Sequence, residues 1–479
     1  MTMRTGRAAM AAACGLFSLT SAAETLQVGP GQAYATPCAA IAAAADGDTI
    51  LIDAAGHYDG DVCAWSTNGL TLRGINGRPR IDAAGNSAQG KAIWVVAGDD
   101  TTIDNVELSG CRVPDANGAG IRQEGVNLTV RNADFHDNEN GILAGDRAGS
   151  TITIEHSVFA NNGAGDGQSH NLYIGHVDRL VFRYNWSHHA VVGHLLKSRA
   201  AENIIEYNRL TGETGGSESY EINLPNGGLS YVIGNLIQQP ATTQNGALLD
   251  YLSEGFGQNT DDRLFVVNNT FVNERGSGTF LQIGAAATTP VIARNNIFHG
   301  GGTPSSQAST VLDHNLVGSD AWFVDAANYD YRLRPGTAAI DAGVDPGSGA
   351  GRSLLPTRVY VHPAAGADRP VVGAIDIGAY EWVGDVVFDD GFDGWAKRTR
   401  RCFAAGRRGR GIPITSAVMP HRAPCPAREE RPTTARRSLP LRHFPAQLDR
   451  VSADPFLRHA RESGHPWKRA QRGCPLSRA

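Results

Sequence analysis

The chain has 479 residues, of which 41% are hydrophobic, and a formal net charge of −5 from 43 basic and 48 acidic residues. This length is ample for a large core and allows several domains or one long one. After the first two dozen residues no apolar run reaches the roughly 18 residues of a membrane helix, so we expect no membrane span.

Residues 1–23 are typical of a cleaved signal peptide. Two arginines precede an apolar run from Ala8 to Leu19, and the small residues Ser21 and Ala23 follow before Glu24. This order of charged, apolar and small segments directs export. We therefore predict a secreted or periplasmic protein.

Three cysteines lie between the signal peptide and the C-terminal tail. Export permits oxidation, and Cys38 and Cys63 are 25 residues apart, about one repeat of the pattern described below. We predict a Cys38–Cys63 disulfide with Cys111 unpaired. The alternative is that all three are buried thiols.

The N-terminal part of the body is predicted to be a cap. From Pro37 the chain reads "PCAAIAAAADGDTILIDAAGHY", an amphipathic segment followed by a first strand. A solenoid needs such a capping coil because its core is otherwise open at the end.

The body then repeats a short β-rich motif, as in "VRNADF", "FRYNWS", "IEYNRL" and "VVNNTF". Its recurring asparagines are spaced by 23, 27, 34, 27 and 19 residues, and they are Asn185, Asn208, Asn235, Asn269, Asn296 and Asn315. A variable period of this size indicates a solenoid with loops inserted between coils. Asparagines stacked at one turn can form a hydrogen-bonded ladder, so we interpret them as structural.

The repeats alternate Val, Ile, Phe and Leu with polar residues and break at Gly and Asn, which favours strands over the helices of leucine-rich repeats. The later segments "YDYRLRPGTAAIDAG" and "VVGAIDIGAYEW" resemble the closing segments of exported bacterial right-handed β-helix proteins of the pectin-lyase-like type. We predict an all-β, single-stranded, right-handed parallel β-helix over residues 24–384.

Residues 385–479 differ in composition from the body. From Ala396 onward there are 20 basic and 5 acidic residues, whereas the rest of the chain has 23 and 43. The tail is rich in proline and arginine without a helix or strand period, so we expect it to be disordered or outside the natural fold. A basic arm for nucleic acid is the alternative, and we predict no nucleic-acid partner.

The stretch "GHLLKSRAAENIIEYNRL" from Gly193 places two cations in an apolar run. Coil stacking should bring Lys197 beside "SHNLYI" of the preceding coil and "YEINL" of the next, because adjacent strands are about 4.8 Å apart. The expected surface is completed by these further residues: His170, Tyr173, His194, Arg199, Tyr220, Glu221 and Asn223, with His189 and Glu218 in the connecting turns. We predict that Lys197, Arg199, His194, His170 and Tyr173 are catalytic and that the others bind substrate. A zinc site in "SHHAVVGH" is possible, but its spacing does not favour one, and we predict no metal site.

"LLKSRAAENIIEYNRL" is similar to the segment around the catalytic lysine in the polysaccharide lyase family of chondroitinase B and its alginate-lyase relatives. The resemblance implies that Lys197 is the base, with Ser198 and Asn203 matching the surrounding pattern. The resemblance in sequence covers about 20 residues, and outside them it rests on the shared β-helix architecture alone.

The sequence departs from that family at two points. Asn223 or a neighbour stands where the family has an arginine, and "HHAVVGH" replaces the acidic calcium ligands expected before the lysine. Calcium is therefore possible but lacks its ligands, and we predict no cofactor. Arg199 or a protonated histidine would have to neutralise the substrate carboxylate.

We predict an enzyme that cleaves an acidic, uronate-containing polysaccharide by β-elimination, acting as a monomer. One alternative is a glycoside hydrolase, for which Glu218 and Glu221, or Asp250, Asp261 and Asp262, could supply paired carboxylates. The other is a glycan-binding or surface-attachment β-helix, which would need exposed aromatic side chains such as Tyr173, Tyr220 and Tyr251.

Overall fold

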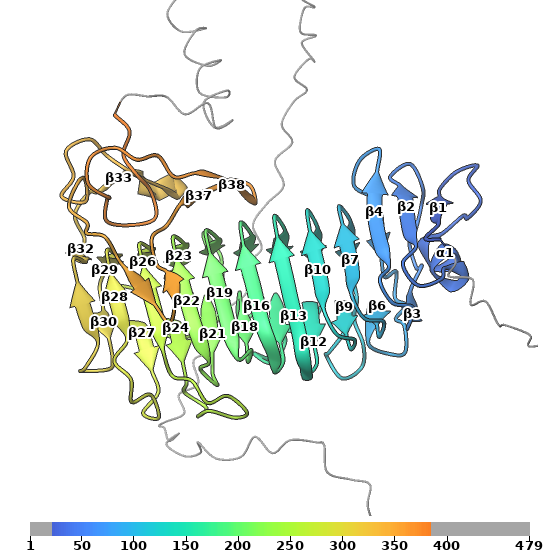
Figure 1. Ribbon diagram of the computed structural model, residues 1–479, viewed down its shortest axis with the longest axis horizontal. Helices are drawn as coiled ribbons and strands as arrows, with labels where there is room; N and C mark the ends of the chain where they lie inside the picture. Colours follow the sequence, from blue (N-terminus) through green and yellow to red (C-terminus); the bar gives the residue numbers. More distant parts are fainter. Residues whose placement is uncertain (1–21, 385–479) are drawn as a thin grey trace, which may run out of the picture. The chain divides into compact units, whose positions relative to one another are not determined.

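A computed structural model describes residues 22–384, so residues 1–21 of the predicted signal peptide and the whole predicted tail fall outside the described residues. The described chain winds into a right-handed solenoid of parallel strands, in which each coil apart from those at the two ends contributes one strand to each of three sheets (Figure 1). The predicted parallel β-helix fold is confirmed.

Sheet A contains β1 (Thr25–Val28), β2 (Thr49–Asp53), β4 (Thr71–Ile75), β7 (Thr101–Asp104), β10 (Leu128–Arg131), β13 (Arg147–Glu155), β16 (Val177–Arg183), β19 (Glu202–Glu206), β22 (Leu229–Ile233), β25 (Leu264–Val267), β28 (Ile292–Arg294) and β31 (Val311–Asp313).

Sheet B contains β3 (Cys63–Trp65), β6 (Ala92–Val96), β9 (Ala119–Gln123), β12 (Asn140–Ala144), β15 (Leu172–Ile174), β18 (Lys197–Ser198), β21 (Ile222–Leu224), β24 (Ala247–Tyr251), β27 (Thr279–Ile283) and β30 (Thr303–Ser305).

Sheet C contains β5 (Arg80–Asp82), β8 (Glu107–Ser109), β11 (Asp134–His136), β14 (Val158–Ala160), β17 (Trp186–His188), β20 (Arg209–Thr211), β23 (Leu236–Gln239), β26 (Thr270–Asn273), β29 (Ile297–Gly300) and β32 (Leu316–Gly318).

Helix α1 (Pro37–Ala43) caps the first coil. Its N-terminus is satisfied by the Thr36 hydroxyl, which accepts a hydrogen bond from the Ala39 N–H, and Pro37 occupies the first turn. Ile41 is buried against the solenoid core. Cys38 of the helix forms a disulfide with Cys63 of β3, and Cys111 is a buried free thiol. Among residues 22–384, no helix is long and apolar enough to cross a membrane.

The predicted asparagine ladder runs along the turn between sheets A and C. Asn235 accepts hydrogen bonds from both the backbone N–H and the side-chain amide of Asn208, at 2.9 Å each. Its own amide donates to the Ile205 carbonyl and to Asn269 Oδ1. The same pattern continues through Asn296 to Asn315, so each buried amide fixes one coil against the next.

The ladder turn needs a left-handed residue immediately before each asparagine. Tyr184 and Tyr207 have φ of 60° and 56°, and their rings stack with centroids 5.7 Å apart. Gly234 continues this row with φ of 68°, and a Cβ there would lie 2.6 Å from the Tyr207 ring. Because tyrosine adopts the same φ at the equivalent turns, it is the closeness of the Tyr207 ring that favours glycine at residue 234.

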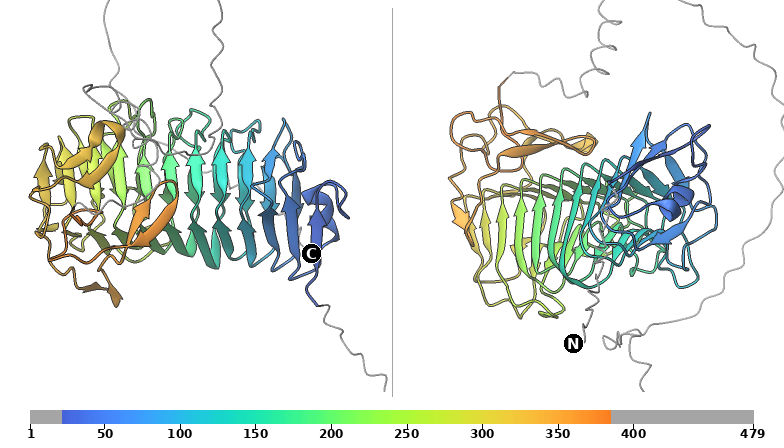
Figure 2. Two further views of the ribbon diagram at one scale, coloured as in Figure 1. Left: turned by 90° about the horizontal axis from the view of Figure 1, so that it is seen from above. Right: turned by 45° about the vertical axis from the view of Figure 1, so that its right-hand side comes forward.

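The chain beyond the last coil folds back along the outside of sheets A and C (Figures 1 and 2). It carries three hairpins: β33–β34 (Phe323–Asp325, Asp330–Leu333), β35–β36 (Ser348–Gly349, Arg352–Ser353) and β37–β38 (Arg358–Val361, Ala365–Asp368). The short helical turn η1 (Ala326–Asn328) joins β33 to β34. Leu354 packs into an apolar cluster with Tyr231 and Phe265 of sheet A. A buried ion pair of 3.0 Å joins Arg369 to Glu381 within the returning segment. Sheets A and C are thus partly covered, whereas the site described below lies on sheet B.

We predict that Asn235→Ala lowers the free energy of unfolding by about 3 kcal/mol, because several buried hydrogen-bonding groups lose their partners at once. Urea unfolding followed by circular dichroism would measure this. Asn328→Ala, at an exposed asparagine of the returning segment, is the matched control and should change stability little. Equal losses in the two variants would contradict the ladder's structural role.

Candidate functional site

The candidate site is a row of side chains on sheet B at the middle of the solenoid. The parallel register places Tyr173 beside Lys197, Lys197 beside Asn223, and Asn223 beside Asp250. The predicted stacking of the three segments is therefore confirmed. Lys197 is half-buried and directed outward, since its chain neighbours Leu196 and Ser198 are fully buried toward the core.

Buried polar contacts fix the strand that carries Lys197. The Ser198 hydroxyl donates to Asn203 Oδ1 at 2.6 Å, and the Asn203 amide donates to the Ala200 carbonyl and to the Ser230 hydroxyl of the next coil. These bonds tie the two-residue strand β18 to β19 and β22. Ser198 and Asn203 thus act on the position of Lys197 from inside the solenoid.

Lys197 and Arg199 both contact Tyr173. The Lys197 ammonium lies 5.0 Å from the centre of the Tyr173 ring, and Arg199 Nε donates to the Tyr173 hydroxyl oxygen at 2.9 Å. Arg199 also pairs with Glu254 at 2.8 Å and donates to the side chain of Asn226. The tyrosine ring therefore lies between two cationic groups, a geometry that attracts cations to the ring face.

The environment lowers the pKa of Lys197 below its ordinary value. Burial is the main cause, and the Arg199 charge acts in the same direction, while Glu254 and Asp250 oppose it. Arg199 keeps its charge, because Tyr173 and Glu254 raise its pKa against the effect of burial. The pair consequently combines a lysine whose pKa is below its ordinary value with a permanent cation.

His170 and His194 are neutral and cannot supply the second cation. Their rings stack 4.4 Å apart, and each Nδ1 accepts a backbone N–H, from His194 and Tyr220 respectively. Burial, together with the neighbouring cations, holds the pKa of His170 well below its usual range and lowers that of His194 to about 3. The expectation that a protonated histidine neutralises a substrate carboxylate is wrong for both residues, and Arg199 is left for this task.

His170 is also fully buried, so the prediction that it lines the open surface is wrong. His189 lies with the residues of sheet C: its ring is 2.7 Å from His188 Nδ1 and 3.2 Å from the Thr214 carbonyl. Tyr220 is half-buried beside His194, with ring centroids 5.1 Å apart. Of the predicted residues, the structure therefore brings Tyr173, His194, Tyr220 and Asn223 together with the Lys197–Arg199 pair. Asn223 is buried beside Lys197, so its predicted place on the open surface is wrong.

Glu218 and Glu221 are wholly buried, which contradicts their predicted place on the surface. All four of their carboxyl oxygens lack hydrogen-bond partners, and a Cβ at Gly212 would overlap the Glu218 carboxyl. Burial raises the pKa of Glu218 to about 7 and that of Glu221 well above its usual range. They can neither bind substrate hydroxyls nor form an accessible pair for glycoside hydrolysis.

Asn223 connects Lys197 to two residues whose place the sequence did not predict. Its amide donates to Asp250 at 2.8 Å, and Asp250 also accepts from Ser253 at 2.5 Å. Burial raises the pKa of Asp250 to about 6. Glu254 follows in the same loop and reaches Arg199. Asp250 and Glu254 could have been identified as neighbours of the site only from the register between coils. That register depends on the lengths of the loops, which the sequence pattern does not fix.

The donors around Lys197 do not match the oxygen-rich shell that calcium requires. His194 stands before the lysine where acidic ligands are expected, and Glu254 is already paired with Arg199. Among residues 22–384, no group of three or more His, Cys, Asp or Glu side chains is arranged to hold a metal ion.

Comparisons with known proteins agree with this architecture. The family model described as "right handed beta helix region" matches residues 63–210, which include Lys197. A search of the curated proteins finds no match. The crystal structure of pectate lyase Pel9A aligns with a TM-score of 0.53 at 16% identity, covering 76% of this chain and 97% of that chain. The protein therefore has a pectate-lyase-like, right-handed parallel β-helix fold.

We predict that Glu218→Gln removes a pH-dependent loss of stability. The folded protein keeps the Glu218 proton up to about pH 7, while the unfolded chain releases it near 4.5, so stability is highest below 4.5 and falls as pH rises toward 7. The loss is about 3 kcal/mol. Urea unfolding on both sides of this range should show a smaller decline in the variant.

The control for this prediction is Glu24→Gln at an exposed glutamate, which should leave the pH dependence of unfolding as in the parent. A parallel decline in parent and Glu218→Gln would contradict the assignment of a buried, protonated Glu218.

Proposed function

We propose that this protein is an exported carbohydrate-active enzyme that cleaves a uronate-containing polysaccharide by β-elimination. The observation that carries the proposal is the outward, half-buried Lys197, whose pKa is lowered and which stands beside the permanently charged Arg199. A base and a cation at one point on the outer face of a solenoid are the two groups that elimination next to a carboxylate requires.

In the proposed reaction Lys197 Nζ takes the proton from the carbon that carries the uronate carboxyl group. The electron pair forms a carbon–carbon double bond as the bond to the leaving sugar oxygen breaks. Arg199 stabilises the negative charge that develops on the carboxylate, in competition with its existing partner Glu254. Tyr173 protonates the leaving oxygen, and its hydroxyl is held in place by Arg199 Nε. Lys197 then returns a proton to Tyr173, so no water is consumed.

Neighbouring neutral groups extend the proposed substrate site along sheet B. His194 uses Nδ1 to accept from the Tyr220 backbone, so its proton is on Nε2, which can donate to a sugar hydroxyl. On the other side of Lys197, Asn223 and Asp250 are buried and hydrogen-bonded to each other, so they support the strand beside Lys197 from within. The polysaccharide would therefore lie across the coils, over the accessible side chains of Tyr173, Lys197 and Tyr220.

The competing functions find less support in the geometry. Hydrolysis needs two accessible carboxyl groups, and Glu218 and Glu221 are buried. Asp261 and Asp262 are engaged by Arg263 and Thr289 instead. A passive glycan-binding face needs aromatic platforms, but Tyr251 is buried with its hydroxyl donating to the Gly228 carbonyl. Export and a monomeric state remain predictions from the sequence.

We predict that Lys197→Ala lowers the rate of elimination roughly a thousandfold, because the reaction loses its general base. The ultraviolet absorbance of the new double bond would be followed on polygalacturonate, alginate and chondroitin. Lys91→Ala, which removes an ion-paired lysine elsewhere on the protein, is the matched control and should keep the parent rate. Cleavage at the parent rate by Lys197→Ala would exclude Lys197 as the base.

We further predict that Arg199→Gln moves the pH–rate profile to higher pH. Activity should rise with pH as Lys197 loses its proton, and Arg199 helps to lower the pKa of that lysine. Removal of the Arg199 charge raises the pKa of Lys197. It also frees Glu254 from its ion pair, and the charge of Glu254 raises the pKa of Lys197 further. The pH dependence of kcat/KM would be compared with that of Arg112→Gln, which changes an exposed arginine. An unshifted profile would separate Arg199 from the titration of Lys197.

A further inference from the structure

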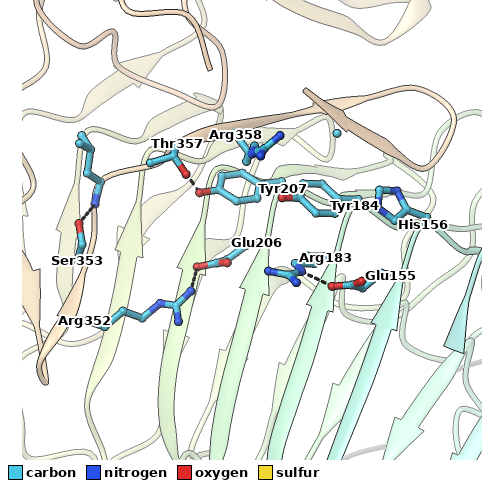
Figure 3. Close-up of a pocket in the computed structure, with 12 residues that line it drawn as sticks. Glu155, His156, Arg183, Tyr184, Glu206, Tyr207, Arg352, Ser353, Thr357 and Arg358 are labelled. Carbon is cyan, nitrogen blue, oxygen red and sulfur yellow. Dashed lines mark hydrogen bonds and ion pairs between the residues drawn. The ribbon is translucent and has the colours of Figure 1, made fainter. Parts of the chain in front are cut away.

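An open cavity lies on sheet A, on a different face from the Lys197 row. It has a volume of about 660 Å³, within the roughly 300–1,000 Å³ range of ligand sites. The solenoid supplies one wall, through the ends of β13, β16 and β19 and the turns that follow them. The returning C-terminal segment supplies the other wall with residues 352–358 and Gly366 (Figure 3).

Three arginines from separate parts of the chain line this cavity. Arg183 comes from β16, Arg352 from β36 and Arg358 from β37. Their side chains are 38–48% exposed, whereas the carboxylates of Glu155 and Glu206 are only 20% and 7% exposed. The acidic groups are thus shielded, and an entering ligand meets guanidinium groups first.

These arginines retain the capacity to bind a further anion. Arg183 pairs with Glu155, Arg352 with Glu206, and Arg358 with an aspartate, Asp368, that is 85% exposed. A guanidinium has five N–H donors in a planar fork, more than one carboxylate can engage. The three carboxylates balance the charge of the three arginines, so binding of an anion depends on direct contact with the remaining guanidinium donors.

The rest of the lining includes aromatic and apolar side chains that suit a sugar ring. His156, Tyr184 and Tyr207 form a stacked row beside the charges, with centroids 4.9 Å and 5.7 Å apart (Figure 3). The Tyr207 hydroxyl accepts a hydrogen bond from the Thr357 N–H, which ties the two walls together. Leu355 is 45% exposed at the cavity and offers an apolar contact for the C–H face of a pyranose.

We propose that this cavity is a second, non-catalytic binding site for an anionic pyranose unit, one bearing a carboxylate or a sulfate group. The Arg183, Arg352 and Arg358 guanidinium groups bind the anion, and Leu355 contacts the ring. The site lies on a different sheet from Lys197, so it would hold a second part of a long acidic chain, or a second chain, without taking part in cleavage. The choice of an acidic saccharide over other anions rests on the proposed function.

Isothermal titration would test the site, using the full chain with Lys197→Ala so that no probe is cleaved. The probes are trigalacturonate for a carboxylate, sulfated galactotriose for a sulfate, and neutral galactotriose. Arg358→Gln is the main variant, because its exposed partner Asp368 makes a structural effect small. Arg80→Gln removes the same charge from an exposed site on sheet C and is the matched control. Ser353→Trp, at an exposed residue of the lining, fills the cavity without changing charge.

We expect the titration to show a class of sites whose affinity for an anionic probe falls roughly tenfold in Arg358→Gln and in Ser353→Trp. The affinity should not change in Arg80→Gln. Whichever anionic probe binds identifies the acidic group, and the neutral sugar should not bind. Identical titrations for Arg358→Gln and Arg80→Gln, or no binding of either anionic probe, would overturn the proposal. Elimination is assayed separately on the chain with Lys197 intact, so its absence would overturn the proposed function and leave the cavity result unaffected.

Discussion

The parallel register between neighbouring coils is the constraint on which the site depends. A spacing of about 4.8 Å between strands places one outward side chain per coil into a continuous row, and a slip by one residue would turn Lys197 into the core. The buried asparagine ladder from Asn185 to Asn315 holds this register on one turn. The Ser198–Asn203 contact holds it at the strand that carries the lysine. Structural polar groups and the candidate reactive groups are therefore linked through the coil geometry.

Burial has opposite consequences for the cationic and acidic groups of this region. Around Lys197 it lowers the pKa of a base that remains accessible, and the fixed charge of Arg199 adds to the effect. Around Glu218 and Glu221 it keeps two carboxyl groups neutral and out of reach. The same low-dielectric interior thus favours proton abstraction by the lysine and disfavours hydrolysis by the acids. This contrast, and not the fold alone, distinguishes the proposed chemistry, because one solenoid fold supports many functions.

Much of the fold could be predicted from the sequence, whereas the site could be predicted only in part. The repeated asparagines and the alternating apolar residues report local conformation, and they indicated the coils, the ladder and the neighbours of Lys197. Burial depends on the surrounding coils and loops, so the sequence could not show that His170, Glu218 and Glu221 are enclosed. Asp250 and Glu254 reach Asn223 and Arg199 only because of the length of the loops between coils, which the repeat pattern does not fix. The cavity on sheet A could not be predicted for a similar reason. It forms only because the segment with Arg352 and Arg358 folds back against strands that lie much earlier in the chain.

The central claim is that the row around Lys197 breaks a glycosidic bond by elimination. Mass spectrometry of the products from polyuronates digested in heavy-oxygen water tests it most directly, because elimination consumes no water. The account predicts unsaturated products, lighter by one water than the saturated oligosaccharides and carrying no label from cleavage once spontaneous exchange is subtracted with a boiled-protein control. Saturated products that acquire heavy oxygen at the cleaved bond would contradict it and show hydrolysis instead.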